Sequence, residues 1–286
     1  MIYSVIDIGS NSVRRMLHDG ERTISKTVKI TRLAEGMGQD KLLSEQAVIR
    51  TASVVQNFVE QSKTENVDKI YAFGTAALRQ ALNRDFFLKK VKDACGVDVE
   101  IISGEMEAEI GLMGALNRTD GGVIDIGGAS AEVIVCKDEK KIYSKSLNIG
   151  VVKIKETCGH NKKSAREYIE ESIKEYGDIP LAKFYSIGGT ATSIASILIG
   201  EKEYNPNKVN GFIIAKSQLL ELVDKLYSME ISQIKNIQGL QAERAEVISG
   251  GALCLLAIMD KIGVNEITVS ESDNLEGYLM VKTEIR

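Results

Sequence analysis

The sequence predicts an α/β protein whose chain folds as two similar halves. Residues 5–13 return as residues 123–131, with six of the nine positions identical. Short apolar strands alternate with longer helical segments along the whole chain, which is the pattern of an α/β protein. At 286 residues the chain is long enough for two medium-sized domains, each with its own core. We therefore expect one domain at residues 1–120 and a second at residues 121–286.

The first half should begin with a strand at residues 3–8 and a hairpin that continues to about residue 30. The clearest helix is expected at 44–63, because Ser44 can serve as N-cap and apolar residues recur on one helical face. Those apolar residues are Val48, Ala52, Val55, Phe58 and Val59. The remaining elements expected are a strand at 70–73, helices near 75–94, a strand at 97–102 and a helix at 105–116.

The second half restarts with a strand at 123–125 and a hairpin through Val135 and residues 142–147. A helix at 164–176, a strand at 184–187, a helix at 190–198, two or three further helices and a strand at 267–270 should follow. The closing helix at 275–282 either ends the second domain or packs back on the first. Because each half opens with strand, turn and hairpin before its α/β crossovers, the plan resembles the actin-like (ribonuclease H-like) superfold of sugar kinases, Hsp70 and actin. That resemblance implies a ligand cleft between the two domains.

The composition is that of a globular protein without membrane spans, with 44% hydrophobic and 27% charged residues. The longest apolar stretch, residues 247–259, is too short to cross a bilayer and predicts a buried helix. The start has no basic segment ahead of an apolar one, so we expect no secretory signal and a cytoplasmic location. A net charge of −4 provides no general attraction for nucleic acid, and a phosphate-rich substrate would need a local basic patch or a divalent cation.

Cysteine and histidine are too sparse for several common kinds of site. The four cysteines are dispersed without a C-x-x-C pair, which fits neither a disulfide framework nor structural zinc. The two histidines, His18 and His160, have no second histidine at ligand spacing. Zinc hydrolase chemistry and a Ser-His-Asp triad are therefore poor fits.

The repeated segment has the form of a phosphate-binding loop. In each copy a strand ends on an aspartate, Asp7 or Asp125, and the chain then turns through glycine and hydroxyl residues. Glycine lets the backbone approach a ligand closely and present successive N–H groups to an anion. The expected phosphate contacts are Gly9, Ser10, Asn11 and Ser12 in the first copy and Gly127, Gly128, Ala129 and Ser130 in the second. Two unrelated strand-turn junctions are the alternative, which the duplication disfavours.

A third glycine turn joins a strand to a helix at Gly188, Gly189 and Thr190. A helix N-terminus carries free N–H groups and a partial positive charge, so this turn could hold another phosphate. It could equally be a tight strand-helix junction in which Thr190 caps the helix. The sequence leaves these two interpretations open.

Residues 72–83 (AFGTAALRQALN) and 101–111 (IISGEMEAEIG), with DIGSNS at 7–12 and DIGG at 125–128, narrow the interpretation. Together these motifs resemble the exopolyphosphatase and guanosine pentaphosphate phosphohydrolase family, Ppx/GppA, from residue 2 to about residue 280. The resemblance implies hydrolysis of terminal phosphoanhydride bonds in polyphosphate or guanosine pentaphosphate. Dimers are common in the family, so a homodimer is expected too.

The resemblance also implies roles for particular side chains. Periodicity alone favours an ordinary solvated carboxylate at Glu107, although it aligns this residue with two glycines on one helical face. In the family the glutamate at this place acts as general base on the attacking water. Arg79 would bind phosphate oxygens, with a helix-surface arginine as the alternative. Weaker candidates for a basic patch are Arg14, Arg15 and Arg32.

Carboxylates at the two repeated turns suggest a divalent metal. Asp125 and Glu132 lie seven residues apart across a glycine turn and can converge as oxygen ligands, which suits Mg²⁺ or another divalent cation. The resemblance places the family's metal at these two residues and makes Glu132 essential for catalysis. Asp7 would supply a third carboxylate from the facing half.

Three motifs depart from the family pattern: the second loop has Ala129 for glycine and Ala131 for threonine, and in the other two motifs Glu109 and Leu275 replace arginine. If these positions contact phosphate, turnover could be weak, and a binding protein for polyphosphate or an alarmone is one alternative to the hydrolase. An ATP-dependent kinase of the same superfold is another. The family's longer members carry a further C-terminal helical region for long polyphosphate, so we expect a preference for short chains or guanosine pentaphosphate.

Overall fold

The computed structural model describes residues 1–38, 40–116, 119–138, 140–200, 202 and 204–283. The chain forms two compact units, the first made of residues 1–110 and 274–286 and the second of residues 111–273. The division therefore falls at residue 110 rather than 120, and the last helix belongs to the first unit. None of the described helices is long and apolar enough to cross a membrane.

The first unit is built on a five-stranded sheet of order β3-β2-β1-β4-β5. Its strands are β1 (Tyr3–Ile8), β2 (Ser12–His18), β3 (Thr23–Ile30), β4 (Lys69–Gly74) and β5 (Glu100–Ile101). Its helices are α1 (Glu45–Thr64), α2 (Ala76–Gln80), α3 (Arg84–Cys95), the first part of α4 (Gly104–Leu116) and α12 (Asn274–Thr283). The central strand β1 runs antiparallel to β2 and parallel to β4.

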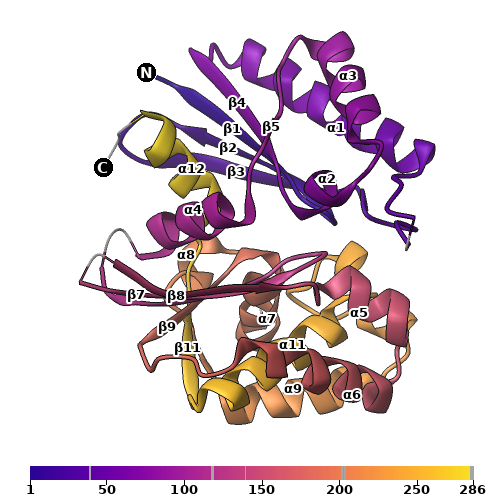
Figure 1. Cartoon of the computed structure of the whole chain (residues 1–286), viewed down its shortest axis with the longest axis vertical. Helices are drawn as coiled ribbons and strands as arrows, with labels where there is room; N and C mark the ends of the chain where they lie inside the picture. The colour runs from indigo at the N-terminus through magenta and orange to yellow at the C-terminus, as the bar shows by residue number, and fades with distance from the viewer. Residues whose placement is uncertain (39, 117–118, 139, 201, 203, 284–286) are drawn as a thin grey trace. The chain divides into compact units, whose positions relative to one another are not determined.

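Helices cover both faces of this sheet, with α1 and α3 on one face and α4 and α12 on the other (Figure 1). Because side chains alternate along a strand, Ile6 and Ile8 of β1 join the core under α1, while Tyr3 and Val5 join the core under α12. Helix α12 lies against α4 so closely that a Cβ atom at Gly277 would be 1.7 Å from the Ile110 carbonyl oxygen.

The predicted N-cap and buried face of α1 are confirmed. The Ser44 hydroxyl accepts a hydrogen bond from the backbone N–H of Ala47 at 3.3 Å. All five apolar residues that the periodicity placed on one face are buried. Local sequence was therefore sufficient for this helix.

The second unit contains a six-stranded sheet of order β10-β11-β9-β6-β7-β8. Its strands are β6 (Gly121–Ile126), β7 (Ala131–Lys137), β8 (Lys140–Leu147), β9 (Phe184–Ile187), β10 (Ile213–Ala215) and β11 (Glu266–Val269). The central strand β6 is antiparallel to β7 and parallel to β9, as β1 is to β2 and β4. The repeated sequence is thus the start of a repeated sheet topology, which confirms the predicted α/β fold of two actin-like units.

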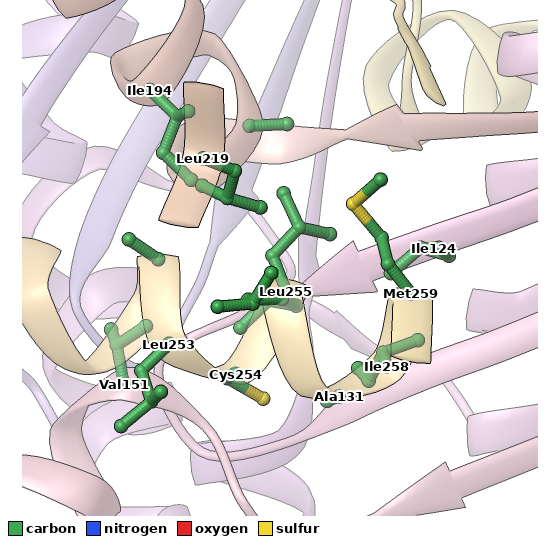
Figure 2. Packing of buried hydrophobic residues seen from close by; sticks show 14 of the residues in the cluster. Ile124, Ala131, Val151, Ile194, Leu219, Leu253, Cys254, Leu255, Ile258 and Met259 are labelled. Carbon is green, nitrogen blue, oxygen red and sulfur yellow. The ribbon is translucent and has the colours of Figure 1, made fainter. Parts of the chain in front are cut away.

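The helices of the second unit are α5 (Val151–Cys158), α6 (Lys162–Ile173), α7 (Gly188–Ile199), α8 (Pro206–Val209), α9 (Lys216–Ser228), α10 (Ile231–Ile234) and α11 (Ile248–Ile262). Helices α5, α6, α7 and α9 pack against α11, which is the predicted buried apolar helix. Figure 2 shows Leu255 and Met259 of α11 in one cluster with Ile124 of β6 and Ile194 of α7. A helix apolar on all sides must be enclosed in this way.

Four elements differ from the sequence predictions. Helix α5 was not expected, because its β-branched residues resemble the end of the preceding strand. Strand β10 was also missed, since three residues show too little alternation for detection. Strand β5 keeps only Glu100–Ile101 of the expected 97–102, and the helix expected at 164–176 ends in a 3₁₀ turn at Lys174–Tyr176.

Candidate active site

The turn after β1 is tied to a neighbouring segment by its backbone. The Gly9 N–H donates to the Ser12 carbonyl at 3.0 Å and closes the hairpin. The carbonyl of Asn11 accepts from the N–H groups of Thr31 and Arg32, and that of Ser10 accepts from Ala34. Ser10 and Asn11 are both buried. These bonds fix the backbone of the predicted first phosphate loop.

The turn after β6 repeats this geometry. The Gly127 N–H donates to the Ser130 carbonyl at 2.9 Å, as Gly9 does to Ser12. The first N–H groups of α5, from Val151 and Val152, bond to the carbonyls of Gly127 and Gly128. A Cβ atom at Gly150 would lie 2.3 Å from the backbone of this loop, so only glycine fits there. The second predicted phosphate loop is therefore held by the start of α5.

The strand register puts a different residue opposite each repeated aspartate. Asp7 lies opposite Arg14, whose Nε and Nη2 donate to Oδ2 of Asp7 at 3.0 and 2.5 Å. At the equivalent place Asp125 lies opposite Glu132. Like charges directly opposite one another destabilise a sheet. The first unit therefore neutralises its aspartate with arginine, whereas the second unit presents two carboxylates that a cation would stabilise.

The surroundings of the two carboxylates are closely packed. Glu132 is 4% exposed, and its Oε1 accepts from the Ser146 hydroxyl at 2.5 Å. A Cβ atom at Gly188 would lie 2.6 Å from Oδ1 of Asp125, and Gly188 has a φ of +77°. Glycine is thus needed at 188 for two reasons, its left-handed backbone and the proximity of the carboxylate.

Within the described residues, no group of three or more His, Cys, Asp and Glu side chains is placed to hold a metal ion. The second unit brings together two of the three predicted metal ligands, Asp125 and Glu132. The third, Asp7, belongs to the first unit, where Arg14 binds it. Two carboxylates suit Mg²⁺, which usually takes one or two from the protein and completes its shell with water and phosphate.

Glu107 is buried at the start of α4 rather than solvated. The Ser103 hydroxyl accepts from the Met106 N–H at 3.1 Å, and its carbonyl accepts from the Glu107 N–H at 2.9 Å. The Glu107 side chain is 10% exposed and its Oε2 accepts from Nη1 of Arg79 at 2.9 Å. The surface alternatives for Glu107 and Arg79 therefore do not hold.

Burial raises the pKa of the Glu107 carboxyl above its ordinary value, and the negative charge of Asp7 acts in the same direction. The Arg79 and Arg14 guanidinium groups oppose that rise in pKa. Desolvation of this nearly enclosed carboxyl is the largest of these effects, so its pKa stays raised. A carboxylate of raised basicity is a better proton acceptor near neutral pH.

Arg79 is oriented by two hydrogen bonds that Nη1 donates. Nη1 donates to Glu107 and also to the Ile102 carbonyl at 3.0 Å. Within the described part of the chain its other guanidinium N–H groups make no side-chain hydrogen bond, and 27% of the side chain is exposed. They can donate to an anion while Nη1 holds Glu107.

The turn into α7 is also fixed from the sheet. The Thr190 hydroxyl donates to the Ile126 carbonyl at 2.7 Å, and no side chain caps the helix. The interpretation of Thr190 as N-cap is therefore wrong, because its hydroxyl bonds a carbonyl of β6 instead. A side chain at position 189 would clash with Arg244, because the guanidinium group lies 2.3–2.7 Å from where a Cβ atom of residue 189 would be.

Arg244 is a candidate that sequence reasoning missed. It stands in a 3₁₀ turn, Ala242–Arg244, that is distant from Gly189 in the sequence. No local pattern marks it, because only the fold brings the guanidinium to the first turn of α7. Its charge adds to the positive potential of that helix end.

The first turns of three helices meet beside the second loop. A Cβ atom at Gly251 of α11 would lie 2.7 Å from Cγ2 of Thr190 in α7 and 3.0 Å from Cγ1 of Val151 in α5. Helix N-termini carry partial positive charge, although the first two N–H groups of α5 already bond to the Gly127 and Gly128 carbonyls. Their convergence favours an anion at this end of the sheet, next to Asp125 and Glu132.

The remaining candidates lie elsewhere or have other partners. Arg15 faces the opposite side of β2 from Arg14, and it bonds Glu65 and, at 3.1 Å, Gln61. Arg32 forms an ion pair with Glu35 at 3.9 Å. Arg15 therefore does not belong to a phosphate site.

Two of the three departures from the family pattern lie in hydrophobic cores, and the third lies on the surface. Ala131 and Leu275 are both completely buried, each inside the hydrophobic core of its unit. Glu109 is exposed on α4. The changes to alanine and leucine are thus core substitutions, and the predicted loss of phosphate contacts at these two positions is not supported.

Comparison with known proteins identifies the same family along nearly the whole chain. The model of the Ppx/GppA phosphatase family matches residues 13–284. A solved structure of the Aquifex aeolicus Ppx/GppA family member superposes with a TM-score of 0.79 at 26% identity, covering 99% of this chain and 98% of that one. The fold described above is therefore that of a solved Ppx/GppA protein.

Three relatives differ in how much of their length the chain matches. A bifunctional 3-dehydroquinate synthase/phosphatase of Fusobacterium nucleatum is 32% identical over 98% of this chain and 46% of its own length. A guanosine-5'-triphosphate,3'-diphosphate pyrophosphatase of Photobacterium profundum is 29% identical over 97% and 58%. Exopolyphosphatase 2 of Mycobacterium tuberculosis is 26% identical over 97% of both chains. The chain spans about half the length of the first two and nearly all of the third, and it belongs to the Ppx/GppA phosphatase family.

Proposed function

We propose that this protein hydrolyses the terminal phosphoanhydride bond of polyphosphate or guanosine pentaphosphate with the help of Mg²⁺. One observation carries the proposal: Asp125 and Glu132 lie directly opposite one another beside a glycine loop and three helix N-termini. Carboxylates attract a divalent cation, and the loop and helix ends attract phosphate. A phosphate chain with bound Mg²⁺ would provide both the cation for the carboxylates and the anion for the loop and helix ends.

The chemistry assigned to the residues is an in-line displacement. Water attacks the terminal phosphorus, Glu107 accepts the proton of that water, and the bond from phosphorus to the bridging oxygen breaks. Orthophosphate leaves together with a chain that is one phosphate shorter. When bound, Mg²⁺ would supply positive charge that offsets the phosphate oxygens.

Other side chains keep these groups in place. Arg79 holds Glu107 through Nη1 and can donate its other N–H groups to a phosphate oxygen. The loops Gly9, Ser10, Asn11, Ser12 and Gly127, Gly128, Ala129, Ser130 would bind the phosphate chain through N–H and hydroxyl groups. Gly188, Gly189 and Thr190 at α7 would extend the second loop. Asp7, bound to Arg14, is proposed as a supporting charge of the first loop.

A binding protein without catalytic activity is less favoured than the hydrolase. Its evidence was the loss of family residues at 131, 109 and 275; positions 131 and 275 lie in hydrophobic cores, and only Glu109 is exposed. The proposed base, its arginine and both carboxylates are present and buried or partly buried. An ATP-dependent kinase would require a second site for the phosphate acceptor, and no contact among the described residues indicates one.

The test is phosphate release by the purified protein with Mg²⁺ on short polyphosphate, long polyphosphate and guanosine pentaphosphate, with ATP as control. Glu107→Gln should lower turnover by about 10²- to 10⁴-fold, the usual contribution of a positioned base. Glu109→Gln is the matched control, since this residue is exposed two positions further along α4. Equal turnover in the wild type and a folded Glu107→Gln protein would refute the assignment.

A further inference from the structure

Three side chains form a row across the strands β6, β7 and β8. Asp125 lies opposite Glu132, and Glu132 lies opposite Ser146. Directly opposite residues on neighbouring antiparallel strands project to the same face of the sheet. The carboxylate pair therefore continues into a hydroxyl on its outer side.

The equivalent row of the first unit shows what is particular to the second. There Asp7 lies opposite Arg14, which lies opposite Val28. Because Arg14 already bonds Asp7, no hydrogen-bond donor is needed on the third strand, and the residue at that position is the apolar Val28. Where the second residue is a glutamate, the third is a hydroxyl that donates to its Oε1 at 2.5 Å.

We infer that Ser146 is a positioning residue: its hydroxyl fixes the carboxylate of Glu132 so that Glu132 and Asp125 hold a divalent cation in one geometry. This inference rests on the metal-binding part of the proposed function. A glutamate side chain has several rotatable bonds, and the charge of Asp125 opposite would push it away. A donated hydrogen bond stabilises the carboxylate and restricts its rotation.

Such a bond acts on the metal through its ligand. Outer partners that orient the carboxylate ligands of a metal typically change metal affinity by about 10- to 100-fold when removed. Mg²⁺ is sensitive to this because it demands nearly ideal octahedral geometry. Loss of the Ser146 hydroxyl should therefore weaken cation binding more than it affects the fold.

The fold is expected to tolerate substitution at this place. Ser146 is exposed on β8, which is an edge strand of the sheet, whereas Glu132 is buried. Ser144 on the same strand is equally exposed, two residues away and on the same face, opposite Ile134. It makes no contact with either carboxylate in the described structure and provides a matched control.

The experiment compares wild type with Ser146→Ala, Ser146→Thr and Ser144→Ala in two assays. The first is Mn²⁺ binding to the protein alone, followed by the loss of the free-ion signal in electron paramagnetic resonance. The second is the Mg²⁺ concentration that half-activates phosphate release. Ser146→Ala should weaken Mn²⁺ binding and raise the required Mg²⁺ by at least tenfold, while the other two variants stay within about twofold of wild type.

Each outcome decides the inference independently of the hydrolase assignment. Weaker Mn²⁺ binding in Ser146→Ala supports it even if the wild type releases no phosphate, in which case the proposed function fails alone. Unchanged Mn²⁺ binding in Ser146→Ala overturns it even if the wild type is fully active. Equal defects in Ser146→Thr and Ser146→Ala also overturn it, because threonine retains the hydroxyl. No Mn²⁺ binding by the wild type overturns it as well.

Discussion

Replacing Gly188 by alanine tests whether the position of Asp125 controls activity. The new Cβ would lie 2.6 Å from Oδ1 of Asp125, whereas ordinary contact begins near 3.4 Å. The carboxylate or the turn must therefore shift by roughly 0.8 Å, the difference between these distances, and a misplacement of about 1 Å can cost 10²-fold in rate. We expect a loss of turnover of that order.

The same substitution also strains the backbone, and this effect has to be separated from the first. Alanine at a φ of +77° costs about 1–2 kcal/mol. Gly200 ends α7 at a φ of +74°, and a Cβ there would be 4.0 Å from its nearest neighbour, the Ile197 carbonyl oxygen. Gly200→Ala therefore reproduces the strain without displacing a carboxylate.

The assays are Mg²⁺-dependent phosphate release and thermal unfolding of both variants. For a unit of this size both should lower Tm by about 2–8 °C, given roughly 2–4 °C for each kcal/mol. Only Gly188→Ala should lose turnover. If the two variants kept equal turnover at equal Tm, the reasoning from Asp125 to the site would be refuted.

Three further predictions concern the proton acceptor, the sheet and the metal. A general base must be ionised to accept a proton, and the pKa of the Glu107 carboxyl is raised. In a pH–rate profile the rate should therefore fall, with decreasing pH, at a value above the ordinary glutamate pKa of about 4.3. A fall in rate only at the ordinary glutamate pKa would contradict this prediction. Thr190→Val should destabilise the second unit by about 1–3 kcal/mol in urea unfolding, since the Ile126 carbonyl loses its buried donor; unchanged stability would count against this bond. Chelation with EDTA should abolish phosphate release and excess Mg²⁺ should restore it, whereas full activity in EDTA would exclude the proposed cation.

The repeated loop has a different charge environment in each of the two units. Both keep the strand, the aspartate and the glycine turn closed by the same backbone bond. They differ in the residue opposite the aspartate, Arg14 in one and Glu132 in the other. A change at one register position thus converts a neutralised aspartate into a pair of carboxylates suited to a cation.

Much of the fold could be predicted from sequence because its signals are local. The repeat at 5–13 and 123–131 is visible in the letters, and alternating strands, the Ser44 cap and the apolar face of α1 depend on neighbouring residues. Helix α5 could not be predicted, since its start is held by carbonyls of Gly127 and Gly128. Strand β10 exists only because β11 pairs with it.

The sequence by itself determined the family, the two repeated loops and the residue types available for phosphate chemistry. Only the tertiary structure decided which charges meet: Arg14 with Asp7, Arg79 with Glu107, and Arg244 with the first turn of α7. It also placed Ala131 and Leu275 in hydrophobic cores. The physical reason is that burial and cross-strand register arise from distant segments packing together, and no window of sequence contains both partners.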